Sequence, residues 1–226
     1  MPNSIFNVFD NIIVFDLETT GIDSKKDEII ELAVLRAERG GDGGHSMTEF
    51  DVFIKLSPGR TLPPFISGLT GITEQLLADE GVSKESASKR LEEVLNCPNP
   101  LLIAYNAQFD LCFLYYFLHR FGKAGALRGI KMLDALTVYK DRRDYPHKLS
   151  DAVDAYSLAT QNTHRAIDDA RATLELVRAM EAEQADLDRY VNLFGYNPKY
   201  GVSGPRISSV KYAPQGYGRT KKLYEE

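Results

Sequence analysis

Two carboxylates stand one residue apart near the start of the chain, in the stretch Ile12-Ile13-Val14-Phe15-Asp16-Leu17-Glu18. The apolar run predicts a buried strand, and residues two apart in a strand share a face. Two anions on one face repel each other and lose hydration unless a cation or a proton neutralises them. Carboxylate oxygens favour Mg²⁺ or Mn²⁺ as that cation. Taken alone, the pair fits a metal site and a solvated acidic turn equally well.

Other acidic groups occur where predicted helices begin. Asp110 follows the apolar run 101–105 and lies in the first turn of the next helix, where the helix dipole also favours a carboxylate. His164 precedes Asp168 and Asp169 at the start of the last predicted helix. Because neighbouring helix residues point about 100° apart, only one of these two aspartates faces a shared site.

Together, these residues make up the groups needed to hold two divalent cations beside a general base. Two such cations clamp the attacking and leaving oxygens of a phosphodiester in an in-line displacement. A histidine, with an ordinary pKa of about 6.5, accepts a proton from the attacking water near neutral pH. The set therefore predicts phosphodiester hydrolysis, whereas His164 alone fits a surface or helix-capping role.

The elements that must position these groups alternate between strands and helices. Three strands joined by short connections predict an antiparallel meander, and later strands separated by helices predict an α/β domain with a mixed sheet. Thr73, Ser83 and Asn106 are placed to cap helices. The predicted strands are 12–17, 28–36, 50–56, 101–105 and 130–134, and the principal predicted helices are 83–96, 108–121, 149–158 and one beginning just after Arg165.

Composition fits one compact globular domain of ordinary size rather than a membrane or secreted protein. The chain has 226 residues, of which 43% are hydrophobic and 26% charged. No signal-like start and no membrane-length apolar run is present, which predicts a soluble cytoplasmic protein. Cys97 and Cys112 lack metal-ligand spacing and are predicted to be reduced core residues.

Helical periodicity ends near Asp188, which divides the chain into a predicted domain, 1–188, and an extension, 189–226. From Gly195 onward there are six Lys or Arg and two Glu, a net charge of +4 in a chain of net charge −5. The aromatic residues of the extension either pack back on the domain or stack on bases. They are Tyr190, Phe194, Tyr196, Tyr200, Tyr212 and Tyr217.

Three separated motifs resemble those of the DnaQ-like, or DEDDh, 3′–5′ exonucleases, including the proofreading members associated with bacterial DNA polymerase III. They agree in order and interval over roughly residues 9–182, which is more specific than a lone Asp-x-Glu. The motifs read Phe15-Asp16-Leu17-Glu18-Thr19-Thr20-Gly21, Asn106-Ala107-Gln108-Phe109-Asp110-Leu111-Cys112-Phe113-Leu114 and His164-Arg165-Ala166-Ile167-Asp168-Asp169-Ala170.

The resemblance implies an RNase H-like fold, a site with two Mg²⁺ or Mn²⁺ ions, and His164 as general base. It implies release of 5′-mononucleotides from the 3′ end of single-stranded DNA, with RNA trimming as the alternative, and association with a DNA polymerase or another replication or repair protein. The implied ligands are Asp16, Glu18, Asp110 and Asp169, and the implied substrate contacts are Thr19, Thr20, Gly21, Leu69, Thr70 and Asn106.

One departure and two alternatives stay open at this point. Tyr105 stands where many relatives have histidine, which affects substrate preference rather than the metal site. A haloacid-dehalogenase-like phosphatase also starts from two acids at a strand end, although its second acid is Asp and not Glu. A binding or polymerase-tethering module without catalysis is the other alternative, although such modules commonly lack one of the five active-site groups.

Overall fold

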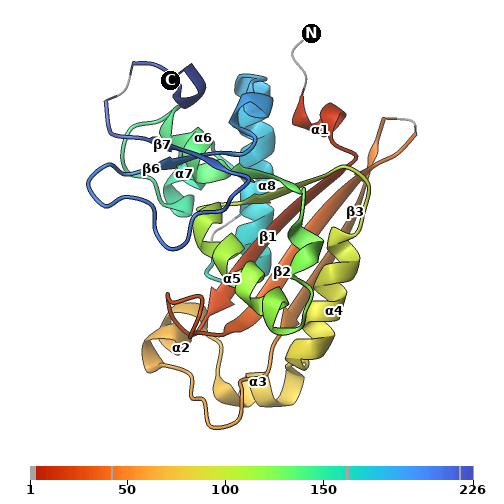
Figure 1. Ribbon diagram of the computed structural model, residues 1–226. Helices are drawn as coiled ribbons and strands as arrows, with labels where there is room; N and C mark the ends of the chain where they lie inside the picture. Colours follow the sequence, from red (N-terminus) through yellow and green to blue (C-terminus); the bar gives the residue numbers. More distant parts are fainter. Residues whose placement is uncertain (1–3, 42, 161–162, 219, 226) are drawn as a thin grey trace.

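A five-stranded mixed sheet forms the centre of the computed structural model, which describes residues 4–41, 43–160, 163–218 and 220–225. The strand order is β3-β2-β1-β4-β5 (Figure 1). The first three strands are antiparallel, whereas β4 and β5 run parallel to β1, which confirms the predicted mixed sheet. The strands are β1 (Asn11–Thr19), β2 (Ile29–Arg39), β3 (His45–Phe53), β4 (Pro100–Ala104) and β5 (Lys131–Asp134).

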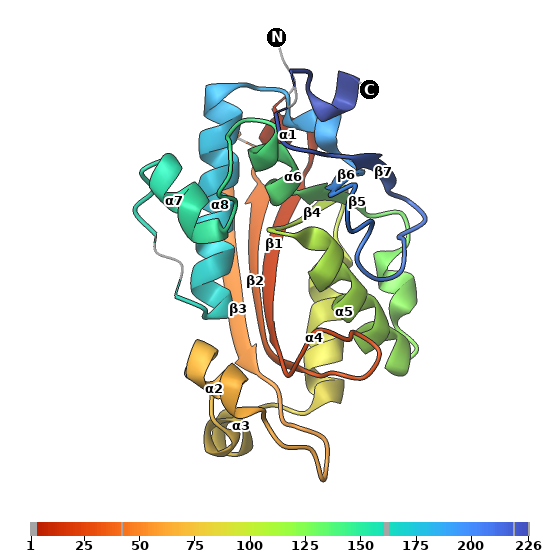
Figure 2. The same cartoon turned by 90° about the vertical axis from the view of Figure 1, so that its left-hand side faces the viewer.

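Helices cover both faces of this sheet, with α8 on one face and α4 and α5 on the other (Figure 2). The alternation of β1 divides its side chains between two cores. Ile12 and Val14 pack with residues of α8, whereas Ile13 and Phe15 pack with residues of α4 and α5. Asp16 therefore continues the face of β1 that α8 covers. The helices on these two faces are α4 (Lys84–Leu95), α5 (Ala107–Arg120), α6 (Ala135–Lys140), α7 (Leu149–Ala155) and α8 (Ala166–Glu183).

Several short elements lie outside the predicted set. β3 also begins five residues earlier than predicted, because residues 46–49 are exposed on an edge strand and show no apolar alternation. The unpredicted elements are α1 (Ile5–Val8), α2 (Pro64–Thr70), α6, β6 (Leu193–Tyr196) and β7 (Lys211–Pro214). The short helix that Thr73 caps is α3 (Glu74–Glu80). Three 3₁₀ turns complete the described part of the chain: η1 (Ala124–Leu127), η2 (Leu187–Tyr190) and η3 (Leu223–Glu225).

The predicted helix caps are correct at two of three positions. Thr73 and Ser83 accept hydrogen bonds from the backbone N–H groups of Leu76 and Ser86. Asn106 occupies the cap position of α5, but its φ of 64° is left-handed and its side chain makes no capping bond, so the predicted cap is wrong. Asp134, at the end of β5, accepts the Ala107 N–H at 3.0 Å instead.

Much of the C-terminal extension packs back on the domain. Tyr190 and Phe194 are almost fully buried in the two main cores, and β6 pairs with β7. Tyr200 and Tyr217, by contrast, are exposed. The boundary at residue 188 stays a prediction, since both segments share the same cores.

The cysteines were predicted to be reduced core residues, and no segment was predicted to span a membrane. Both cysteines are free thiols, and Cys112 is buried whereas Cys97 is half-buried. Over the described ranges, no helix is long and apolar enough to cross a membrane.

Candidate active site

Three of the predicted carboxylates meet between the end of β1 and the start of α8. Asp16, Glu18 and Asp169 each offer an oxygen, and these oxygens lie within 4.8 Å of one another. Asp168 turns away and accepts hydrogen bonds from the Thr163 hydroxyl at 2.7 Å and from Arg171 at 3.4 Å. Of the two neighbouring aspartates, it is therefore Asp169 that faces the strand carboxylates.

Asp110 is not one of the three residues whose oxygens lie within 4.8 Å of one another, but its charge interacts with two of them. It comes from the first turn of α5, on the other face of the sheet, and is almost completely buried. Its charge raises the pKa of Asp16, and that of Glu18 raises the pKa of Asp110. The four carboxyl groups thus form one electrostatic unit built from β1, α5 and α8.

Burial is the main reason why these carboxyl groups hold their protons unusually tightly. Desolvation and the neighbouring acids raise the pKa of Asp16 and Asp110 well above its ordinary value. The same causes raise the pKa of Glu18 to about 8, with Asp169 and Glu31 as the contributing acids. Burial raises the pKa of Asp169 to about 6, against a smaller opposing effect of the Thr163 backbone N–H. Such a cluster is stabilised by protons or by cations.

These shifts predict an unusual pH dependence in the absence of divalent cations. A carboxyl group with a raised pKa binds its proton more tightly in the folded chain, so its contribution to stability is lost as pH rises. For Glu18, the free energy of unfolding should fall between pH 4.5 and about 8. Thermal unfolding with a chelator, over a pH series, measures this fall, and added Mg²⁺ should reduce it.

The matched variant for this pH dependence is Glu18→Gln, which removes the titrating group and keeps the side-chain shape. Its stability should decline less steeply with pH than that of the wild type. An identical slope in both proteins would contradict the raised pKa of Glu18.

His164 lies at the exposed mouth of this cluster, two residues before α8. A positive charge on the imidazole lowers the pKa of Asp169, so His164 lies within electrostatic reach of that carboxylate. Its φ of 59° is left-handed, a conformation that is costly for a residue other than glycine. Such strain persists only where the surroundings hold the backbone in place.

Glu31 supplies that anchoring, and sequence analysis did not identify it. Its carboxylate is fully buried and lies directly opposite Glu18 in the β1–β2 register. One oxygen accepts from Arg165 Nε and Nη2 at 2.9 and 2.8 Å, and the other accepts the Ala166 N–H at 3.1 Å. The pair therefore fixes the residue after His164 and the first turn of α8 to the sheet.

The glycine-containing turn after β1 is held by its own hydrogen bonds. Thr19 donates its hydroxyl to the Gly21 carbonyl at 2.6 Å, and the Thr20 hydroxyl accepts the Glu28 N–H at 3.0 Å. A Cβ on Gly21 would lie 2.4 Å from a carboxylate oxygen of Asp27. The carboxylate of Asp27 therefore occupies the space beside Gly21 that a side chain would need.

The remaining predicted substrate contacts differ in exposure. Leu69, near the end of α2, is exposed, whereas the hydroxyl of Thr70 donates to the Ile66 carbonyl inside the helix. Asn106 is exposed in its left-handed conformation. Tyr105, beside it, donates its hydroxyl to the His147 carbonyl at 2.9 Å. Leu69 and Asn106 therefore remain available to a ligand.

Comparisons with known proteins assign the chain to a family. Residues 13–177 match the sequence model of the RNase_T exonuclease family. The chain therefore belongs to this family, and it is a DnaQ-like 3′–5′ exonuclease domain, as the three motifs predicted. This membership removes the dehalogenase-like phosphatase from consideration.

Two relatives illustrate where such a domain occurs. The chain is 33% identical over 173 residues to a PolC-type DNA polymerase III of Clostridium perfringens, covering 75% of this chain and 11% of that protein. It is 31% identical over 198 residues to the 3′-5′ exonuclease DinG of Staphylococcus epidermidis, covering 84% of this chain and 20% of that protein. The chain thus spans only a small part of the length of these relatives.

Solved structures of Escherichia coli exonuclease I share the fold. A complex of that enzyme with single-stranded DNA has a TM-score of 0.71 and 20% sequence identity, covering 80% of this chain and 42% of that one. A further structure of an exonuclease I gives a TM-score of 0.72 and 19% identity, covering 80% of this chain and 43% of that one. The expected RNase H-like fold is therefore confirmed.

Proposed function

We propose that this domain removes 5′-mononucleotides one at a time from the 3′ end of single-stranded DNA. The observation that carries the proposal is the convergence of Asp16, Glu18 and Asp169 within 4.8 Å, with Asp110 buried beside them. Carboxylate oxygens at this density fit hard divalent cations and are costly without them.

Each group of the site has a role in the proposed reaction. Asp16, Glu18, Asp110 and Asp169 would hold two Mg²⁺ or Mn²⁺ ions, which supply charge stabilisation for the attacking and leaving oxygens. His164 takes the proton of the attacking water, since it is exposed to solvent and lies within electrostatic reach of Asp169. Glu31 and Arg165 position that histidine.

DNA is the preferred substrate class, with RNA as the alternative. The PolC-type DNA polymerase III of Clostridium perfringens contains a matching region, and an exonuclease I of the same fold has been solved with single-stranded DNA. The same relative supports a DNA polymerase as partner, and a DNA-processing role is consistent with the predicted cytoplasmic location. Substrate contacts are proposed at Leu69 and Asn106, with the turn of Thr19, Thr20 and Gly21 and with Thr70 shaping the pocket.

Direction, product and metal requirement can be tested together. A strand labelled at its 5′ end should shorten in single steps from the other end, and a strand labelled at its 3′ nucleotide should release a labelled 5′-mononucleotide at once. Mg²⁺ or Mn²⁺ should support both reactions and a chelator should stop them. Activity that persists in chelator, or cleavage within a strand whose 3′ end is blocked, would contradict the proposal.

Matched RNA and DNA strands in the same assay distinguish the two substrates. Faster shortening of DNA supports the proposed substrate, whereas faster shortening of RNA makes the domain an exoribonuclease. Wild-type chain that binds a strand and cleaves neither would support the non-catalytic module instead.

A further inference from the structure

An exposed aromatic surface outside the carboxylate cluster joins the C-terminal extension to the loop between α6 and α7. Tyr145 and Tyr217 are 72% and 67% exposed. Their rings lie edge to face, with centroids 5.9 Å apart, and the Tyr217 ring also stacks on His147 at 5.9 Å with an interplanar angle of 5°. We call these three residues the aromatic platform.

The His147 member of the platform is anchored to the domain, and the two tyrosines are exposed. The His147 ring nitrogen Nε2 bonds to the Arg143 carbonyl at 2.9 Å, and its carbonyl accepts the Tyr105 hydroxyl at 2.9 Å. Tyr139 packs edge to face beneath the imidazole at 5.6 Å. A rigid aromatic face loses little entropy when a flat ring stacks on it.

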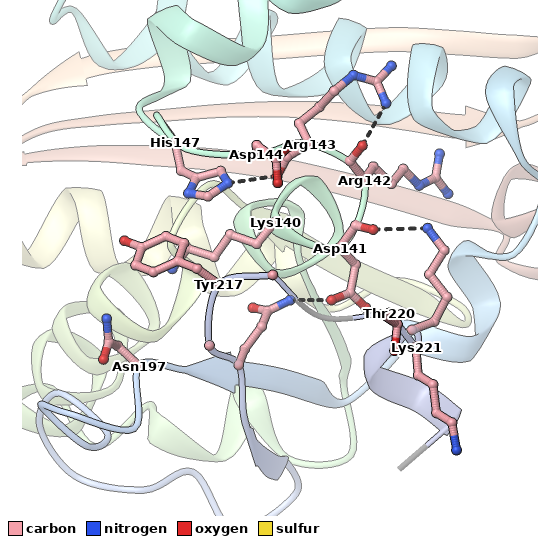
Figure 3. A pocket seen from close by; sticks show the side chains of 14 residues that line it. Lys140, Asp141, Arg142, Arg143, Asp144, His147, Asn197, Tyr217, Thr220 and Lys221 are labelled. Atoms are coloured by element: carbon pink, nitrogen blue, oxygen red, sulfur yellow. Dashed lines mark hydrogen bonds between the residues drawn. The ribbon is translucent and has the colours of Figure 1, made fainter.

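The stacked pair lines two cavities. One, of about 260 Å³, is lined by His147 and Tyr217 together with residues of the extension (Figure 3). The other, of about 460 Å³, is lined by the same pair together with Tyr145 and Pro146. Lys140 lines both cavities, and Figure 3 shows its side chain reaching toward Tyr217.

The Lys140 ammonium makes no hydrogen bond or ion pair with any residue that the structure describes, although its charge lowers the pKa of the buried Asp134. The nearby arginines differ, since Arg142 and Arg143 are paired with Glu183. Around the two cavities, basic side chains outnumber acidic ones by six to three. The basic residues are Lys140, Arg142, Arg143, Lys148, Lys221 and Lys222, and the acidic residues are Asp141, Asp144 and Asp151.

The acidic residues here are largely committed to the protein itself. Asp141 accepts hydrogen bonds from Gln215 and from the Leu223 N–H, and Asp151 accepts the Lys148 N–H at the start of α7. These carboxylates keep their charge, and Arg142 and Arg143 are paired with Glu183, so Lys140 is a cation that is left beside the platform without a hydrogen-bond partner in the described part of the chain. Exposed rings beside a cation that has no hydrogen-bond partner in the described residues match the two parts of a nucleotide, the base and the phosphate.

We propose that the aromatic platform and Lys140 form a stacking site for a base of single-stranded nucleic acid, with the adjoining phosphate near Lys140. This inference rests on the proposed function, because a strand whose 3′ end occupies the carboxylate cluster leaves its 5′ part free to bind elsewhere. The Tyr105 hydrogen bond ties the platform to the end of β4, next to Asn106 and α5.

Substitution of Tyr217 tests the site through the dependence of binding on strand length. Fluorescence anisotropy with oligo-dT strands of three and of twelve nucleotides, in chelator, measures affinity without cleavage. Tyr217→Ala should weaken binding of the longer strand by about 5- to 100-fold more than that of the shorter one, which is the usual effect of losing one stacked base. Tyr217→Phe should keep most of the affinity, since stacking needs the ring and not the hydroxyl.

The control is Tyr200→Ala, which removes an equally exposed tyrosine of the extension that lies against Lys199 and outside both cavities. It should leave both affinities unchanged. Equal losses in the two variants, or unchanged long-strand affinity in Tyr217→Ala, would overturn the stacking site. The proposed function is tested separately, by cleavage of either strand by the wild type in Mg²⁺. If no cleavage occurs, the proposed function is contradicted, while the binding assay in chelator still tests the stacking site.

Discussion

Asp169→Asn should reduce the rate of mononucleotide release by about 10³-fold or more, whereas Asp168→Asn should stay within about threefold of the wild type. The substitution keeps the shape of the side chain and removes one negative charge from the cluster with Asp16 and Glu18. Loss of a single preorganised electrostatic group commonly costs about 10²–10³ in rate, and loss of a metal ligand costs at least as much.

Asp168 is a close control because it has the same chemistry one residue away. Its carboxylate accepts from Thr163 and Arg171 outside the cluster, and its replacement weakens one exposed and one partly buried surface contact. Initial rates on a 3′-labelled strand at saturating Mg²⁺ measure both variants. Similar rates in the two variants, or a greater loss in Asp168→Asn, would mean that the cluster is not the catalytic centre.

Local patterns were sufficient to predict the strand pair and the helix that bring Asp16, Glu18 and Asp169 together. Alternation places the first two on one face of β1, and helical periodicity places α8 immediately after Arg165. Both features are short-range, so the sequence contains them directly. The convergence of the three carboxylates depends on how α8 packs on the sheet. This long-range arrangement was predicted from the order of the three motifs, which resembles that of the exonuclease family.

Glu31 shows what such patterns leave out. In the sequence it interrupts an apolar strand, as any surface glutamate does, and its partner Arg165 lies 134 residues away. The same limit explains Asn106, whose expected capping role is filled by Asp134, which lies 27 residues after the Ala107 N–H that it accepts. Long-range pairing of this kind depends on the fold and leaves no local periodicity.

The extension was difficult to predict for a different reason. β6 and β7 have four residues each, and they contain Gly195 and Pro214, which are poor strand formers. Their pairing and the burial of Phe194 are decided by contact with the domain. The aromatic residues of the extension were predicted either to pack on the domain or to stack on bases. Phe194 is packed on the domain, whereas Tyr217 is exposed.

Arg165→Ala should lower the free energy of unfolding by about 2–4 kcal/mol, because it leaves the buried Glu31 carboxylate without its cation. Glu31 is 0% exposed and the Arg165 side chain 37% exposed, so the loss should fall below that of a fully buried pair. Arg171→Ala is the matched control, since Arg171 also projects from α8 and pairs with Glu49, which is itself exposed. Its cost should be about 0–1 kcal/mol.

Denaturant unfolding in chelator measures both arginine variants, and Arg165→Lys should be intermediate because lysine keeps the charge but not the forked geometry. The cause of the loss is tested by adding Glu31→Gln to Arg165→Ala. If the unpaired buried charge dominates, the double variant recovers part of the lost stability, since glutamine carries no charge to desolvate. Additive losses would instead mean that packing of the arginine stem is what stabilises the start of α8.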